Sequence, residues 1–141
     1  MKKVNKVKPI EDKLLLRQTE TCSYIKQKPV FSFEYLVTKN LCDSKDCHNN
    51  NLYRDLFIRL QKIDELGWSE VRKSDRHQYG TEKIDVSNFK IDLPNSITPD
   101  VTSMIVFRAD GKKHVFAGFM RYDIFFIVFI ECNFGNLYDH D

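Results

Sequence analysis

The stretch MIVFRADGKKHVFAGFMRYDIFFIVFIEC, residues 104–132, decides the fold. Turn signals divide it into three apolar runs, each of strand length, at residues 104–109, 114–121 and 124–132. Asp110-Gly111, between the first two runs, is among the strongest short hairpin signals, because glycine accepts the positive φ that a type I′ turn demands. We therefore expect an antiparallel meander, with residues 137–138 as a candidate last strand.

The third run is apolar on both faces of a strand. Residues 124–130 read IFFIVFI and offer no polar side. A strand of this kind is buried from both directions, so we expect it in the centre of the sheet with a helix on at least one face. Tyr122-Asp123, immediately before it, provides a second tight turn.

Upstream of the meander, residues 51–66 carry the clearest helical pattern. Charged side chains cover one side, and an apolar stripe covers the other, formed by Leu52, Leu56, Phe57, Leu60 and Ile63. Gly67 is placed to end this helix, because a glycine adopts the left-handed conformation that often follows the last turn. Residues 68–72 then suit a short second helix.

The remaining segments complete one domain. Residues 30–37, VFSFEYLV, alternate between apolar and polar side chains and predict a half-buried strand. Residues 81–86 are a candidate short strand, and residues 87–101 predict an irregular connection. We expect a single α+β domain over residues 30–140, with a long and a short helix packed on an antiparallel sheet. Residues 1–28 precede it as a basic N-terminal arm.

Charge is unevenly distributed along the chain. Overall, 22 basic side chains stand against 20 acidic ones, for a net charge of +2. Residues 1–29 hold eight of the basic and three of the acidic side chains, so this part carries +5 and the rest carries −3. Such an arm can contact phosphates or an acidic partner. No apolar stretch is long enough for a membrane helix and no secretory signal is visible, so we expect a cytoplasmic protein without membrane contact.

The four cysteines, Cys22, Cys42, Cys47 and Cys132, are expected to be reduced thiols, because intracellular proteins rarely hold disulfides. Cys42-x4-Cys47-His48 has residue types that bind zinc, but structural zinc sites usually combine two close pairs, and the sequence has no second pair. We therefore expect no metal and no other cofactor. Motifs of nucleotide triphosphatases, Rossmann dehydrogenases, zincins and α/β-hydrolases do not occur in the sequence.

Several short motifs resemble a family of small uncharacterised bacterial and mobile-element proteins. They are FSFEYL at 31–36, LGWSEV at 66–71, EKI at 82–84, VFR at 106–108, GF at 118–119, DIFFIVFI at 123–130 and LYDH at 137–140. The element order, helices followed by a meander that ends in His or Tyr, is also similar to RelE/ParE-type toxins. This second resemblance implies a RelE-like toxin, a metal-independent endoribonuclease whose partners would be RNA or the ribosome and an antitoxin.

A metal-independent ribonuclease needs a base, a cation for the developing phosphorane charge and an acid. His77 and His140 are the acid–base candidates. Arg108 and Arg121 would hold the phosphate, and Tyr138 would stack on a base or position the ribose.

Four further residues are candidates for binding nucleic acid: Lys83, Lys112, Lys113 and His114. His114 follows a lysine pair at the start of a strand, where we expect a solvated edge position.

A second hypothesis leaves open whether the protein is an enzyme at all. A non-catalytic phage or mobile-element protein that binds and inhibits a host complex would suit the near-neutral charge and the 13% aromatic content, because aromatic side chains anchor interfaces. In that case the His and Arg candidates would be scattered over the surface and would not share a cleft.

Overall fold

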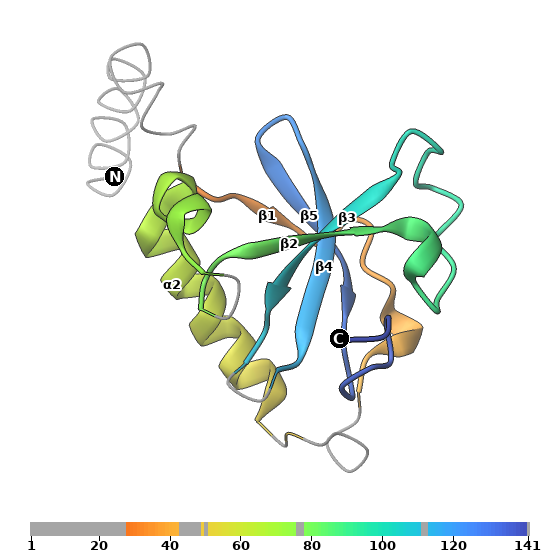
Figure 1. Ribbon diagram of the computed structural model, residues 1–141, viewed down its shortest axis with the longest axis horizontal. Coiled ribbons are helices and arrows are strands. Elements are labelled where there is room, and N and C mark those ends of the chain that lie inside the picture. The colour runs from red at the N-terminus through yellow and green to blue at the C-terminus, as the bar shows by residue number, and fades with distance from the viewer. Residues whose placement is uncertain (1–27, 43–48, 50, 76–77, 111–112, 141) are drawn as a thin grey trace, which may run out of the picture.

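The computed structural model describes residues 28–42, 49, 51–75, 78–110 and 113–140 (Figure 1). Its centre is a five-stranded sheet with the strand order β1-β5-β4-β3-β2. The strands are β1 (Phe31–Ser32), β2 (Thr81–Asp85), β3 (Ser103–Arg108), β4 (Val115–Arg121) and β5 (Ile124–Ile130). A long helix, α2 (Leu52–Lys73), packs on the sheet, and two 3₁₀ turns, η1 (Thr38–Asn40) and η2 (Val86–Asn88), lie in the connections. The α+β class is as predicted.

The meander is confirmed. Strand β4 pairs antiparallel with both β3 and β5, and β2 extends the sheet beyond β3. Tyr122 and Asp123 form the predicted tight turn, with φ of 56° and 64°, the left-handed values that a type I′ turn requires. The last strand expected at residues 137–138 does not form. Instead, the carbonyl oxygen of Leu137 accepts a hydrogen bond from the backbone of Lys90, 2.6 Å away, in the irregular segment after η2.

The β3–β4 connection differs from the predicted two-residue turn. It spans residues 109–114 and closes with a hydrogen bond from the Ala109 backbone N–H to the His114 carbonyl oxygen, at 2.7 Å. The Asp110 side chain turns inward, where its carboxylate accepts the His114 backbone N–H at 3.0 Å. A type I′ turn at Asp110 would leave this carboxylate at the surface, so its buried partners determine the longer loop.

The first strand is much shorter than predicted, and it runs parallel to its neighbour in the sheet, whereas the prediction was an antiparallel sheet. Only Phe31 and Ser32 pair with β5, and they do so in parallel, so the sheet is mixed and not purely antiparallel. The chain then turns, with the Leu36 N–H bonded to the Phe33 carbonyl oxygen at 3.1 Å. This turn breaks the alternation on which the prediction depended and leaves Phe33 46% exposed.

Helix α2 follows its apolar stripe with one exception. Leu52, Leu56, Leu60 and Ile63 are buried, whereas Phe57 is 64% exposed, because the residue after Leu56 lies about 100° farther around the helix. Gly67 has the predicted positive φ but an extended ψ (φ 79°, ψ 163°), so α2 is kinked there, and the residues after the kink form the short helical segment that the sequence predicts. No helix in the described part of the chain is long and apolar enough to cross a membrane.

Both faces of the sheet are covered, as the sequence of β5 predicts. Phe125 and Ile127 point toward the buried stripe of α2, whereas Phe126 and Val128 belong to a second core cluster on the other face. Irregular chain covers this second face, including apolar side chains between residues 89 and 101 and the C-terminal Leu137 and Tyr138. The C-terminal segment and α2 therefore lie on opposite sides of the sheet (Figure 1).

Candidate active site

A pocket of about 600 Å³ opens on the sheet face opposite α2. Strands β2 and β3, the β3–β4 loop and the C-terminal segment supply its walls. Its chemically active side chains are Glu82, Arg108, Lys113, Tyr138, Asp139 and His140, with Phe134 beside them. Four of these, Arg108, Lys113, Tyr138 and His140, are among the residues that the sequence predicts for catalysis or nucleic-acid binding.

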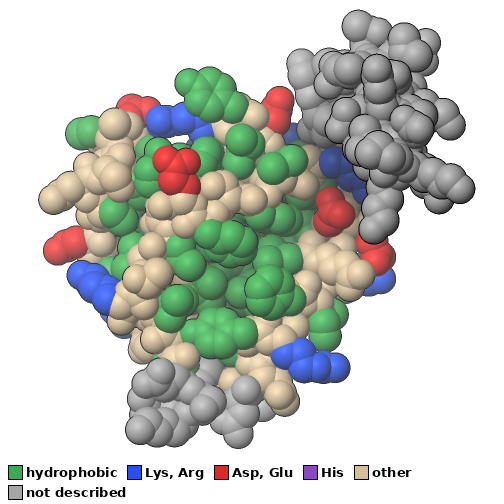
Figure 2. Space-filling view, turned by 180° about the vertical axis from the view of Figure 1, so that it is seen from behind, with side chains coloured by type: hydrophobic (Ala, Val, Ile, Leu, Met, Phe, Trp, Pro, Cys, Tyr) green, Lys and Arg blue, Asp and Glu red, His purple; other side chains and the backbone are tan. Residues whose placement is uncertain are grey.

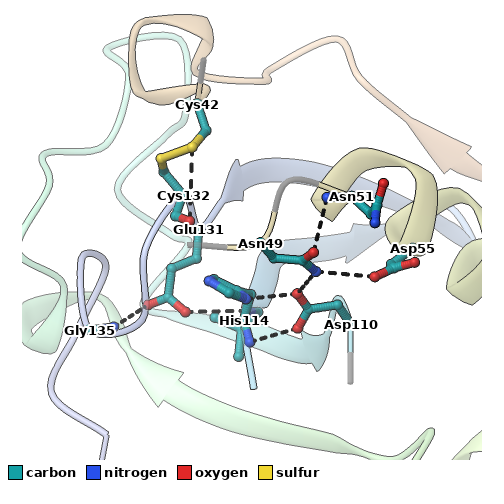
Figure 3. A network of polar contacts seen from close by, with 10 residues as sticks. Cys42, Asn49, Asn51, Asp55, Asp110, His114, Glu131, Cys132 and Gly135 are labelled. Atoms are coloured by element: carbon teal, nitrogen blue, oxygen red, sulfur yellow. Dashed lines mark hydrogen bonds and ion pairs between the residues drawn. A yellow bond between two sulfur atoms is a disulfide. The ribbon is translucent and has the colours of Figure 1, made fainter. Parts of the chain in front are cut away.

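Glu131 organises the C-terminal wall of the pocket. It follows β5 directly, and its side chain is fully buried. One carboxylate oxygen, Oε2, accepts the backbone N–H group of Gly135 at 2.9 Å (Figure 3). The same oxygen accepts the N–H of Leu137 at 3.5 Å, and the other oxygen accepts the N–H of Val115 at 3.3 Å. The carboxylate thereby ties the chain after β5 to the start of β4.

The same oxygen of Glu131 lies 3.0 Å from Nε2 of His140. An ionised carboxylate only accepts hydrogen bonds, so Nε2 carries the hydrogen and a neutral His140 keeps its lone pair on Nδ1. The imidazole lies between two aromatic rings, with centroid distances of 4.0 Å to Phe134 and 4.3 Å to Tyr138. A histidine oriented by a buried carboxylate is the usual arrangement of a general base.

Glu131 was missed in the sequence, although a signal was present. It is a single acidic residue that directly follows the seven apolar residues 124–130. If such a carboxylate is buried with the strand, it needs hydrogen-bond partners to offset the loss of water. The partners of that carboxylate, above all His140, depend on the fold of the C-terminal segment.

Two cations reach the pocket from neighbouring parts of the chain. Arg108 ends β3 and shares the pocket face with Val106, because side chains alternate along a strand. Lys113 precedes β4 in the left-handed conformation, with φ of 73°. Asp139 contributes negative charge, but its carboxylate pairs with Lys90 at 2.7 Å, and this hydrogen-bonded ammonium lowers the pKa of Asp139.

His114 belongs to a different, buried network (Figure 3). Its ring Nδ1 lies 2.7 Å from Asp110 Oδ2, and the Asn49 amide donates to that oxygen at 2.6 Å and to Asp55 of α2 at 3.1 Å. His114 is only 2% exposed, so the expectation of a solvated edge position is wrong, and a nucleic-acid contact of this histidine stays a prediction. The network fixes the β3–β4 loop to the start of α2, which explains why this histidine is internal.

Two of the other sequence candidates lie outside the pocket in the part of the chain that the structure describes. Arg121 lies near the β4–β5 turn, where its guanidinium donates to Asp100 at 2.9 Å. Lys83 is exposed, and strand alternation directs it away from the pocket-lining Glu82. Tyr138 lines the pocket but is only 5% exposed. His77 and Lys112 lie outside the described residues.

The cysteine expectation is wrong for two of the four residues. Cys42 and Cys132 form a disulfide across 90 residues of sequence, with a Cα–Cα distance of 5.0 Å (Figure 3). The Tyr53 hydroxyl of α2 holds the backbone of Cys42 through two hydrogen bonds, of 2.6 and 3.0 Å. Cys42 is therefore not a zinc thiolate in this structure, and no cluster of three possible metal ligands occurs among the described residues. Cys22, Cys47 and His48 lie outside them.

No protein-family model, curated protein or solved structure matches this chain. The pocket brings together a hydrogen-bonded imidazole, two cationic and two acidic side chains, and an exposed aromatic ring.

Proposed function

We propose that this protein is a metal-independent endoribonuclease of the RelE-like toxin kind and that the pocket is its active site. The observation that carries the proposal is the Glu131–His140 pair in a pocket that also receives Arg108 and Lys113. These residues come from three separate parts of the chain.

The reaction uses groups of the chain itself. His140 Nδ1 accepts the proton of a ribose 2′-hydroxyl, and the buried carboxylate of Glu131 stabilises the imidazolium that results. The 2′-oxygen forms a bond to the adjacent phosphorus while the bond from phosphorus to the 5′-oxygen breaks. Arg108 and Lys113 neutralise the charge of the phosphorane.

The leaving 5′-oxygen takes a proton, so the products are a 2′,3′-cyclic phosphate and a 5′-hydroxyl end. His77 remains the sequence candidate for the acid that supplies this proton. The RelE-like assignment itself is supported by the order of elements, a helix followed by a meander with His140 beyond its last strand.

Induced expression in a bacterium tests the proposal. The wild-type chain should arrest growth and fragment cellular RNA, and His140→Ala should relieve both effects. Lys73→Ala is the control, because it removes an exposed cation at the far end of α2 and should stay toxic. Intact growth and RNA with the wild-type chain, or full toxicity of His140→Ala, would overturn the proposal.

A second candidate function, the non-catalytic inhibitor, is favoured by one surface. Figure 2 shows hydrophobic side chains gathered in the centre of one face, with charged side chains toward its rim. Two exposed apolar residues, Val30 and Phe33, also flank the short strand β1. A contiguous apolar patch often marks an interface. If this function holds, Phe33→Ser abolishes the cellular effect whereas His140→Ala retains it.

A further inference from the structure

We infer that the pocket holds an unpaired nucleotide whose base stacks on Phe134, so that the substrate is single-stranded RNA. This inference rests on the proposed function and adds a binding residue and a substrate class to it.

Phe134 is a large apolar residue in an unusual place. It lines the pocket, is 45% exposed and belongs to neither core cluster. Its ring centroid lies 4.0 Å from that of His140, with an angle of 31° between the ring planes. Core packing therefore does not account for the aromatic ring, whereas its position beside the proposed base does.

The turn that presents Phe134 is held firmly. The Gly135 N–H donates to Glu131 at 2.9 Å, and Lys90 Nζ donates to the Gly135 carbonyl oxygen at 2.9 Å. The Asn136 N–H donates to the Asn133 carbonyl oxygen at 3.0 Å and closes the turn. The backbone of the turn is held by these hydrogen bonds, and the ring rests against His140. Phe134 is therefore a preorganised platform, because little conformational entropy is lost when a ligand stacks on it.

The position of this ring suits a nucleotide in particular. One side of Phe134 contacts His140, and its exposed part is available for a base. Stacking on aromatic rings is how proteins hold single-stranded nucleic acid, and the backbone phosphates then follow nearby cations. Arg108 and Lys113 line the same pocket and supply those cations.

A base in a duplex cannot use this platform. Both of its faces are covered by neighbouring base pairs, and turning it out of the stack breaks its stacking and its pairing. A single strand, a loop or an end presents the base without that cost. The site should therefore prefer unpaired RNA.

Fluorescence anisotropy with a 2′-fluoro RNA tests this inference, because a strand without 2′-hydroxyls binds but cannot be cleaved. The same labelled strand is titrated alone and after annealing to its complement. Four proteins are compared: wild type, Phe134→Leu, Phe134→Trp and the control Phe57→Leu. Phe57 is a matched control, since it is an exposed phenylalanine on α2 outside the pocket.

The single strand should bind the wild-type protein more tightly than the duplex. Phe134→Leu should weaken that binding about 5- to 100-fold, Phe134→Trp should preserve it, and Phe57→Leu should leave it unchanged. Equal affinity for strand and duplex, or unchanged binding by Phe134→Leu, would overturn the inference and leave the proposed function standing. Failure of the wild-type protein to bind either form would overturn both.

Discussion

Nε2 of His140 lies 3.0 Å from the Oε2 atom of Glu131, and that same buried oxygen accepts the N–H groups that hold the C-terminal turn. One carboxylate thus orients the proposed base and folds the segment that carries it. Stability and activity are therefore coupled at Glu131, and the coupling can be measured.

We expect Glu131→Gln to lower the free energy of unfolding by roughly 3 kcal/mol, because charge-assisted hydrogen bonds in a buried site are lost. Urea denaturation measures this change. Glu70→Gln removes a carboxylate that is 58% exposed on α2 and should shift stability by less than about 0.5 kcal/mol. A Glu131→Gln protein as stable as the wild type would show that the carboxylate does not organise the segment.

Gly118 and Gly135 should respond very differently to alanine. A Cβ at Gly118 would collide with the carbonyl oxygen of Phe126, at the point where β5 contains an irregularity in its register with β4. Gly118→Ala should therefore cost about 3 kcal/mol or more of stability. Gly135 has open space around it, so Gly135→Ala should cost only about 1–2 kcal/mol, for its left-handed φ of 89°.

Thermal unfolding of both variants checks this difference. Similar losses in the two proteins would contradict the close packing at Gly118, because of these two glycines Gly118 alone has a backbone atom at the position of the added methyl group.

The disulfide should stabilise the oxidised protein. It joins residues 90 apart, and in the chain-entropy model a link across a loop of this length contributes about 4–5 kcal/mol. We expect Cys132→Ser to lower Tm under oxidising conditions and a reductant to lower the wild-type Tm to the same level. A wild-type Tm that does not change on addition of reductant would contradict a stabilising disulfide between Cys42 and Cys132.

The pKa of Asp139 should depend on Lys90. The hydrogen bond and charge of Lys90 lower that pKa, so Lys90→Ala should raise it toward its ordinary value. Because the pKa is lowered in the folded state, the pair stabilises the fold above the unfolded-state pKa and loses its contribution as the pH falls through the folded-state value. An NMR titration of the carboxyl carbon measures the shift, with Lys83→Ala as the control. An unchanged pKa in Lys90→Ala would contradict the ion pair.

Much of the fold was predictable because local patterns determine it. The run at residues 124–130 requires burial on both faces, and Gly67 interrupts the helix with a positive φ, as its place after the apolar stripe predicts. The errors occur where a distant partner decides the conformation. The Asp110 side chain turns inward because Asn49 and His114 form hydrogen bonds with it. The direction of β1 depends on its partner strand β5, which lies far along the chain and pairs with it in parallel.

The site was predictable by residue type and only in part by position. Arg108 and His140 were identified as candidates, and the structure places them in one pocket. Arg121 is also an arginine on a strand of the meander, but it lies at the end of β4, outside the pocket, and its guanidinium donates a hydrogen bond to Asp100. Neither the Glu131–His140 contact nor the Cys42–Cys132 bond could be predicted, because each depends on how irregular segments cross the end of the sheet.

The most direct test of the proposed active site is RNA cleavage by the purified protein in the presence of EDTA, with the ends of the products identified by mass spectrometry. Wild-type protein should produce 2′,3′-cyclic phosphate and 5′-hydroxyl ends. The His140→Ala protein should cleave at least about 100-fold more slowly, as expected for loss of a general base. A substrate with a single 2′-deoxy nucleotide at the cleavage position should stay intact. Uncut RNA, cleavage at the wild-type rate by His140→Ala, or 5′-phosphate ends would contradict the proposed active site.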